Sequence, residues 1–338
     1  MDPLEPNFSD NPSENTTPFG NRLDLTDLHQ SIEQIRQEIR KIIVGQHQLI
    51  DLLLVALLSE GHVLIEGVPG VAKTLTAKLL SKTIDTNFSR IQFTPDLMPS
   101  DVIGTSIFNF KTSEFDFKQG PIFSNIVLID EINRAPAKTQ AALFEVMEER
   151  QITADGHEFK MEEPFIVLAT QNPVEQEGTY RLPEAQLDRF LFKIEVGYPS
   201  LEEETQIISA FHQNKNKVQL QDIQAVISPA QLASYKEVVR VVQIEEKLLK
   251  YISQIVHNTR NNKNLYLGAS PRASLSLLAA SKSYAVLQGR DFVTPEDIQY
   301  LASAVLNHRI ILSPDREMEG VTPDQIIQQL IAQIEVPR

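Results

Sequence analysis

A glycine-containing loop over residues 67–74 has the residue types and the context of a phosphate-binding site. An apolar segment that predicts a buried strand precedes the loop, and a helix-forming segment over residues 74–80 follows it. Backbone N–H groups at a helix N-terminus have no partner within the helix, so they bind anions. In such a site Lys73 would neutralise charge on the β- and γ-phosphates, and the Thr74 hydroxyl would be a ligand of Mg²⁺.

One position of this loop differs from the general pattern G-x-x-x-x-G-K-[ST]. Ala72 stands where the pattern has its second glycine. Alanine is tolerated there only if the position needs neither a positive φ nor the closest approach of backbone to phosphate. The alternative to a phosphate site is an ordinary Gly/Pro turn followed by a lysine, so other residues must decide between the two.

Two carboxylates, Asp130 and Glu131, follow an apolar segment over residues 126–129. A fully apolar strand favours burial on both faces, as in a parallel sheet, and ligands of open α/β sheets bind at the carboxyl ends of the strands. We expect Asp130 to hold Mg²⁺ through water, and Glu131 to polarise the water that attacks the γ-phosphate. The alternative, two acids that merely end a strand, is disfavoured by the phosphate loop upstream.

Other segments must position these residues. A third apolar segment, over residues 165–170, predicts a strand followed by Asn172, whose amide could hold the attacking water or the γ-phosphate; an isolated Asn-Pro pair would only make a turn. Helices are expected over residues 28–42, 46–59, 74–80, 136–150 and 182–192, a strand over residues 90–94, and hairpins around residues 106–117 and 155–156. After residue 200 the pattern is helical, with a strand only at residues 291–293.

The composition is that of an ordinary globular protein of 338 residues, with 42% hydrophobic and 22% charged residues. The net charge of −14 argues against a general binder of nucleic acid. The absence of cysteine excludes disulfides, thiolate metal sites and cysteine nucleophiles, and it is compatible with a cytoplasmic protein. No apolar segment is long enough to span a bilayer, so we expect no membrane insertion.

In order along the chain, five segments resemble motifs of the AAA+ ATPases, and within them of the MoxR family. They are residues 67–74 (Walker A, which in this family accepts alanine at Ala72), 128–135 (Walker B), 169–173 (sensor 1), 182–190 (arginine finger) and 268–273 (sensor 2). The similarity runs from about residue 42 to residue 310. The resemblance implies a P-loop NTPase domain, an α/β parallel sheet with helices on both faces, and a C-terminal α-helical lid, with ATP between them.

The resemblance also implies roles for single residues. Catalytic roles fall to Glu131, Asn172, Arg189 and Arg272. Nucleotide contacts fall to Val44, Gly45, Gly67, Val68, Pro69, Gly70, Val71, Ala72, Lys73, Thr74, Leu75 and Asp130, with Thr74 and Asp130 as the ligands of Mg²⁺. With the composition it predicts a flexible tail over residues 1–25, the nucleotide-binding domain over 26–198 and the lid over 199–338.

Arg189 is expected on the opposite flank from Lys73, where it would serve the ATP of a neighbouring subunit. The alternative is a surface pair with Asp188 or Glu184. Arg181 stands where the family commonly has proline, which leaves open whether Arg134 or Arg181 adds a second intersubunit arginine.

The family assembles into rings, often hexamers, and commonly works with von Willebrand A-domain proteins as a chaperone-like remodeller. The leading hypothesis is therefore an ATPase (ATP and Mg²⁺ as cofactors) that remodels or matures partner complexes. A nucleotide-gated scaffold with little turnover is disfavoured by Glu131, since binding alone needs no water-activating carboxylate. A nucleic-acid motor is disfavoured by the acidic charge, and a magnesium-chelatase-like motor subunit is nearest in mechanism.

Overall fold

The structure is a computed structural model that describes residues 22–111, 113–154, 156–172, 180, 182–213 and 220–337. Most of the predicted tail lies outside the described residues, as do Asp155, Pro173 and Arg181. Among the helices that are described, none is both long enough and apolar enough to cross a membrane.

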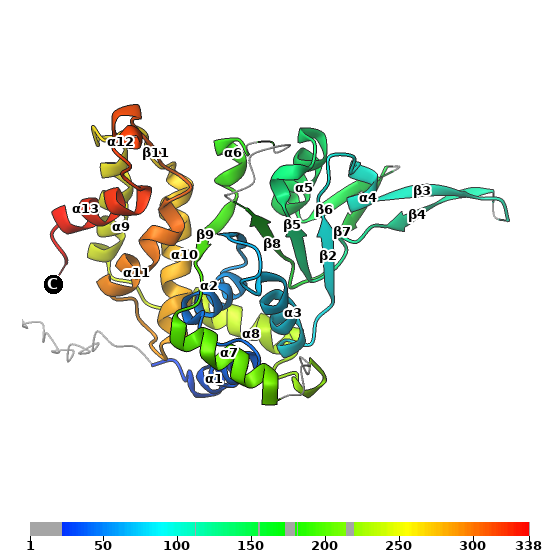
Figure 1. The fold of residues 1–338 in the computed structure, drawn as a ribbon, viewed down its shortest axis with the longest axis horizontal. Helices are drawn as coiled ribbons and strands as arrows, with labels where there is room; N and C mark the ends of the chain where they lie inside the picture. The colour runs from blue at the N-terminus through cyan, green and yellow to red at the C-terminus, as the bar shows by residue number, and fades with distance from the viewer. Residues whose placement is uncertain are drawn as a thin grey trace, which may run out of the picture.

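Five parallel strands form the central sheet, in the order β2-β5-β8-β1-β9 (Figure 1). They span His62–Gly67 (β1), Phe88–Gln92 (β2), Ile126–Asp130 (β5), Ile166–Gln171 (β8) and Phe190–Val196 (β9). Side chains alternate between the two faces of a strand, so Val63 and Ile65 pack in one hydrophobic core and Leu64 in the other. The predicted parallel sheet, buried on both faces, is confirmed.

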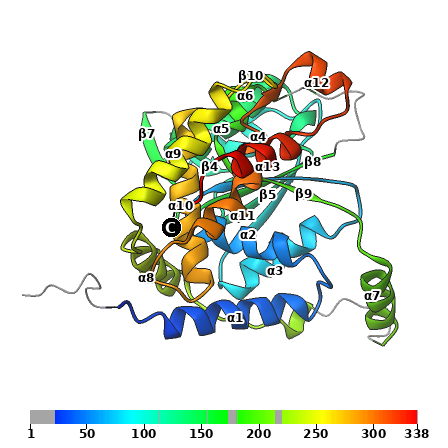
Figure 2. The same cartoon turned by 90° about the vertical axis from the view of Figure 1, so that its left-hand side faces the viewer.

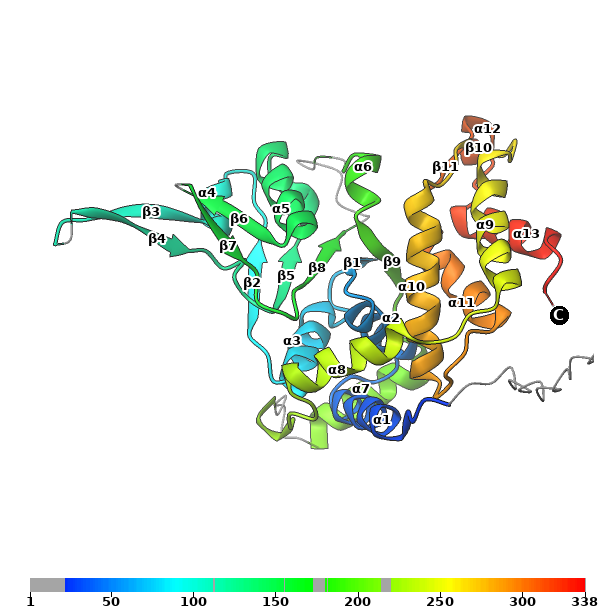
Figure 3. The same ribbon diagram turned by 180° about the vertical axis from the view of Figure 1, so that it is seen from behind.

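Helices lie on both faces of this sheet (Figures 1 and 3). One core joins the sheet to α1, α2 and α3, and the other joins it to α4 and α5. These helices span Thr26–Arg40 (α1), His47–Leu58 (α2), Lys73–Thr83 (α3), Pro99–Ile103 (α4) and Ala137–Glu149 (α5), and a 3-10 turn covers Ile132–Arg134. Helix α3 begins at Lys73, where the loop that follows β1 ends.

Two antiparallel hairpins confirm the predictions from alternation. The first pairs β3 (Gly104–Asn109) with β4 (Glu114–Gln119) and projects far from the body of the molecule (Figure 1). The second pairs β6 (Gln151–Ala154) with β7 (His157–Lys160).

Most of the helices after residue 200 lie beside the sheet at its β9 edge (Figure 2), but the helix over residues 229–240 packs against α1 and α2. They span Leu201–Gln213 (α7), Pro229–Arg240 (α8), Glu246–Arg260 (α9), Pro271–Leu287 (α10), Pro295–Leu306 (α11), Pro314–Met318 (α12) and Pro323–Gln333 (α13), with a 3-10 turn over Leu220–Asp222. The segment after α11 bonds to the backbone of β9: Asn307 donates to the Lys193 carbonyl at 3.3 Å, and Arg309 donates to the Leu191 carbonyl at 3.1 Å. These bonds fix the helical part to the edge of the sheet.

Two predictions about secondary structure are wrong. The helix expected over residues 182–192 is only Glu184–Leu187 (α6), and the apolar residues from Phe190 onward form β9, because pairing with β1 outweighs the local helical pattern. After residue 200 a small sheet pairs β10 (Leu265–Leu267) with β11 (Ile311–Leu312), and residues 291–293 contribute a single bridge, between Gln243 and Phe292.

Candidate functional site

The loop after β1 leads into α3 through two left-handed residues. Gly70 has φ +89°, with no atom within 4 Å of the place a side chain would occupy, and Ala72 has φ +58°. The condition set for Ala72 is therefore not met, since the position does require a positive φ. A left-handed residue with a side chain costs about 1–2 kcal/mol, which explains the glycine of the general pattern. The open space at Gly70 lets a ligand approach the backbone closely.

Lys73 is the first residue of α3, and its side chain turns back over the loop. Its Nζ donates to the Gly67 carbonyl at 2.6 Å. Burial lowers the pKa of Lys73, while the carboxylates of Asp130, Glu131 and Glu66 act in the opposite direction. A half-buried ammonium held by one neutral carbonyl is well suited to bind an anion, because a phosphate oxygen would be a stronger partner.

The two acids at the carboxyl end of β5 are held by side chains from both neighbouring strands. Asp130 accepts from Arg90 Nε at 2.5 Å and from Thr170 Oγ1 at 3.2 Å. Glu131 accepts from Gln92 Nε2 at 2.7 Å and pairs with Arg134 Nε at 3.1 Å.

The backbone of Glu131 is itself left-handed, with φ +57° and ψ +53°. Its N–H donates to Thr170 Oγ1 at 3.1 Å, and the 3-10 turn begins immediately after it. Sparsely populated backbone conformations of this kind cost about 1–3 kcal/mol and cluster at functional sites. The carboxylate that follows this backbone conformation lines the cavity beside the phosphate loop.

One cavity of about 390 Å³ brings most of the predicted site residues together. Its lining comprises Pro69, Gly70, Val71, Ala72, Lys73, Thr74, Leu75, Arg90, Gln92, Asp130, Glu131, Thr170 and Asn172. The Thr74 hydroxyl and the Asp130 carboxylate supply hard oxygen donors, which are the ligands that Mg²⁺ prefers. The donor set therefore fits a nucleotide-bound magnesium ion. Gly67 and Val68 precede the lining residues as the base of the loop.

A second cavity, of about 370 Å³, adjoins the first through Gly70, Val71, Ala72 and Leu75. Val44 and Gln46 line it from the turn between α1 and α2, and Ile207 and Phe211 line it from α7. Gly45 lies between these lining residues, where a side chain would collide with the Glu203 carboxylate at 2.1 Å. A mostly apolar recess beside a phosphate site is suited to a nucleobase.

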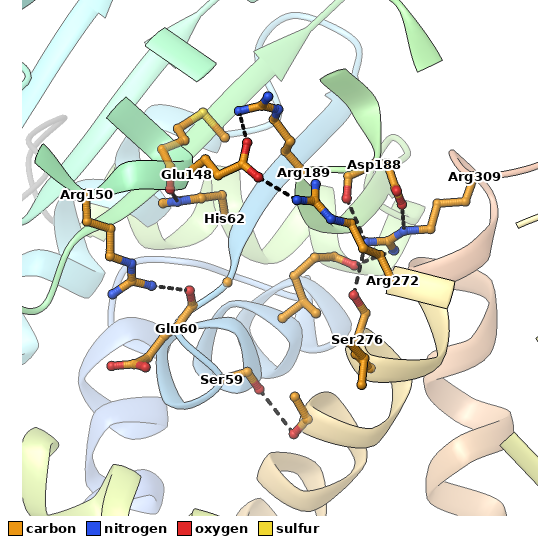
Figure 4. Close-up of a pocket in the computed structure, with 15 residues that line it drawn as sticks. Ser59, Glu60, His62, Glu148, Arg150, Asp188, Arg189, Arg272, Ser276 and Arg309 are labelled. Carbon is orange, nitrogen blue, oxygen red and sulfur yellow. Dashed lines mark hydrogen bonds and ion pairs between the residues drawn. The ribbon is translucent and has the colours of Figure 1, made fainter. Parts of the chain in front are cut away.

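Arg189 and Arg272 lie in a different cavity, of about 370 Å³, between the sheet and α10 (Figure 4). Both guanidinium groups pair with Glu148, near the C-terminal end of α5. Arg272 Nη2 lies 2.5 Å from its Oε1, and Arg189 contacts its Oε2. These arginines lower the pKa of Glu148. Arg189 Nη1 also donates to the Phe144 carbonyl at 2.7 Å.

Asp188, next to the predicted arginine finger, pairs with residues of the lid and not with Arg189. It accepts from Arg309 Nε at 2.7 Å and from Ser270 Oγ at 2.8 Å (Figure 4). The Arg309 side chain is 2% exposed and also donates to the Phe190 carbonyl at 2.7 Å. This cluster joins the segment that carries Arg189 to two parts of the lid, the start of α10 and the residues after α11.

We expect Arg309→Met to lower the free energy of unfolding by about 3 kcal/mol, the lower end of the range for breaking a buried ion pair. The reason is that Asp188 and the β9 carbonyls lose their donors. Urea unfolding monitored by circular dichroism measures the change. Arg240→Met is the matched control, because Arg240 is 62% exposed and such surface pairs contribute about 0–1 kcal/mol. Equal effects of the two substitutions would contradict the assignment.

The two arginines lie near the amino ends of the strands, and the phosphate loop lies at the carboxyl end of β1. His62, at the start of β1, lines the cavity of Arg189, whereas Gly67, at the end of β1, accepts from Lys73. From His62 to Gly67 the strand rises by five residue steps of about 3.3 Å each, so the two cavities are separated by roughly 16 Å along β1. Of the described segments after residue 200, α7 and the residues around the 3-10 turn at Leu220–Asp222 line the cavity that adjoins the phosphate cavity, whereas Arg272 lines neither of the two.

Sequence reasoning missed several residues of both cavities. Arg90 and Gln92 share one face of an expected strand, and the register of β2 beside β5 brings them to the two acids. Their alternation was visible, but the neighbouring strand was not. Glu148 and Arg309 gave no local signal, because their contacts join residues far apart in the sequence.

Comparison with known proteins agrees with this geometry. A family model described as "ATPase family associated with various cellular activities (AAA)" matches residues 62–192, and one described as "AAA lid domain" matches residues 257–330. The crystal structure of a candidate ATPase from Cytophaga hutchinsonii is similar, with a TM-score of 0.85 and 42% identity, over 92% of this chain and 97% of that one.

Three relatives are similar over nearly their whole length. The uncharacterized protein YeaC of Bacillus subtilis is 47% identical, over 92% of this chain and 96% of its own. Chaperone MoxR1 of Mycobacterium tuberculosis is 43% identical, over 98% and 88%. Protein MoxR of Methylorubrum extorquens is 30% identical, over 91% and 94%.

Proposed function

Because the chain belongs to the MoxR family of AAA+ ATPases, we propose that it binds ATP with Mg²⁺ and hydrolyses it to ADP and phosphate. The observation that carries the proposal is the single cavity that joins Lys73 and Thr74 to Asp130, Glu131 and Asn172. A phosphate-binding cation, an oxygen donor set for magnesium and a carboxylate able to activate water are the parts that phosphoryl transfer to water needs.

Each residue has a distinct part in this proposal. The N-terminus of α3 and Lys73 hold the β- and γ-phosphates, and Thr74 with Asp130 would hold Mg²⁺, which supplies charge neutralisation when bound. Glu131 accepts a proton from the attacking water, and the Asn172 amide orients that water or the γ-phosphate. Val44, Gly45 and Gln46 enclose the base together with α7.

The separation of the two arginines from the phosphate loop supports a ring in which neighbouring subunits complete each other's sites. In a head-to-tail ring, the edge with Arg189 and Arg272 of one subunit meets the phosphate cavity of the next. Arg189 then stabilises charge on the transferring phosphoryl group, with Arg272 beside it. A hexamer is the assembly we expect. Arg134 pairs with Glu131, and Arg181 lies outside the described residues, so the source of a further arginine stays open.

The hydrolysis is proposed to drive chaperone-like remodelling or maturation of a partner complex, with a von Willebrand A-domain protein as the partner class. The word chaperone belongs to the name of the relative from M. tuberculosis. A cytoplasmic location stays a prediction. Steady-state ATP turnover with and without candidate partners distinguishes the remodeller from a scaffold that binds nucleotide and hydrolyses little.

We expect Lys73→Ala to weaken ATP binding by about 10–100-fold, since charge-assisted hydrogen bonds contribute about 1.5–3 kcal/mol. The fold should persist because, within the part of the chain that the structure describes, the Lys73 side chain donates a hydrogen bond only to the Gly67 carbonyl. Equilibrium titration with a fluorescent ATP analogue measures the affinity, and circular dichroism checks the fold. Lys138→Ala, a lysine on the exposed side of α5, is the matched control. Near-native affinity of Lys73→Ala would refute the phosphate site.

A further inference from the structure

Both carboxylate oxygens of Asp130 already have donors from the protein. Thr170 Oγ1 donates to Oδ1 at 3.2 Å, and Arg90 Nε donates to Oδ2 at 2.5 Å. Asp130 itself is 8% exposed. A residue proposed to hold magnesium is therefore engaged by a cation of the chain.

The two contacts differ in how firmly they are held. Thr170 belongs to the buried strand β8, and its side chain also accepts from the Glu131 N–H. The Arg90 side chain comes from the edge strand β2 and is 53% exposed, and its Nη2 makes only a long hydrogen bond, 3.4 Å, to Gln92 Oε1 among the described residues. Arg90 can thus leave Asp130 at little cost, whereas Thr170 cannot.

The contact between Arg90 and Asp130 affects the balance of charge in the phosphate cavity. Among the described residues that line the cavity, the cations are Lys73 and Arg90, and the anions are Asp130 and Glu131. A nucleotide that arrives without magnesium would meet an unneutralised Asp130 if Arg90 were absent. Like charges at close range disfavour binding, the more so in a partly desolvated cavity.

We propose that Arg90 takes the place of Mg²⁺ at Asp130 in the nucleotide-free protein, and that the metal displaces it when Mg²⁺ and nucleotide bind together. The side chain acts as a built-in counter-cation, which keeps the cavity receptive to nucleotide before the ion arrives. Arg90 is a positioning residue in this account, since it acts through Asp130. The inference rests on the proposed function, because it requires that nucleotide bind in this cavity.

The test measures nucleotide affinity with and without magnesium, and needs no catalysis. A fluorescent ADP analogue is titrated into the full chain in excess Mg²⁺ and, separately, in EDTA. Arg90→Ala should lose about tenfold in affinity in EDTA, which corresponds to about 1.4 kcal/mol, and stay within about twofold of the unsubstituted chain in Mg²⁺. The Mg²⁺ concentration that restores half of the affinity should also fall, because the ion no longer competes with Arg90.

Three variants sharpen the interpretation. Arg90→Lys keeps the charge and should retain most of the affinity in EDTA. Lys138→Ala, on the exposed side of α5 and outside this cavity, should leave the dependence on magnesium unchanged. In an Asp130→Asn background, Arg90→Ala should have no further effect in EDTA, because no negative charge remains to be neutralised.

Two outcomes would overturn the inference. An equal loss for Arg90→Ala with and without Mg²⁺ would make Arg90 a direct phosphate contact, and no change in either condition would make its pair with Asp130 incidental. Failure of the unsubstituted chain to bind nucleotide in both conditions would instead refute the proposed function.

Discussion

Glu131→Gln is expected to bind ATP and Mg²⁺ normally and to hydrolyse ATP about 10²–10⁴-fold more slowly, the usual range for lost general acid–base assistance. The amide preserves the shape of the side chain and can still accept the hydrogen bond that Gln92 donates at 2.7 Å. It cannot accept a proton from water as a carboxylate does. The loss should therefore fall on turnover alone, measured as phosphate release at saturating ATP.

A matched control separates chemistry from the shape of the turn. Gln92→Ala removes a hydrogen bond to Glu131 but leaves the carboxylate, so its turnover should fall less than that of Glu131→Gln. Nucleotide titration of both variants checks that the cavity is intact. Wild-type turnover in Glu131→Gln would refute the assigned role of Glu131. If the variant is inactive as expected, it can be used to capture partner proteins in the ATP-bound state.

The sequence predicted the parts of the fold that depend on local patterns. Uninterrupted apolar strands and the helix after the phosphate loop were identified correctly, because burial on both faces and the start of a helix leave signals within a few residues. The segment from Phe190 onward was assigned to a helix, because its partner β1 lies more than a hundred residues earlier. Short apolar runs are ambiguous until a pairing strand is known.

In the candidate site, too, local patterns predicted some residues correctly, whereas the placement of others depends on contacts between distant segments. Lys73, Thr74, Asp130, Glu131 and Asn172 all follow strands that could be recognised, and the parallel sheet brings their ends to one edge. The positions of Arg189 and Arg272 depend on how the lid docks, which the bonds from Asn307 and Arg309 to β9 decide. No local pattern encodes that docking, so the opposite placement of Arg272 required the structure.

The position of Arg189, far from the phosphate loop of its own chain, leads to a second large expected loss of turnover. Arg189→Ala is expected to bind ATP normally and to lose about 10³–10⁵-fold in turnover, the range for an arginine supplied by a neighbouring subunit. Within the described ranges, the contacts of the Arg189 guanidinium with Glu148 and the Phe144 carbonyl are made by Nη1, so Nε and Nη2 can donate to phosphate. The Arg189 cavity opens at the starts of β1 and β9, so this side chain cannot reach the phosphate loop of its own chain.

Mixing variants decides whether the arginine acts between subunits. Lys73→Ala subunits retain Arg189, and Arg189→Ala subunits retain Lys73, so each can complete the other where they meet. In a head-to-tail ring assembled at random from equal amounts, roughly one interface in four pairs an intact cavity with an intact arginine. Partial turnover should return in this mixture. Turnover should stay absent when the Lys73→Ala subunits of the mixture also carry Arg189→Ala, because such subunits have no Arg189 to supply to a neighbour. Inactive mixtures whose co-assembly is shown by size-exclusion chromatography of differently labelled subunits would exclude Arg189 as the intersubunit residue.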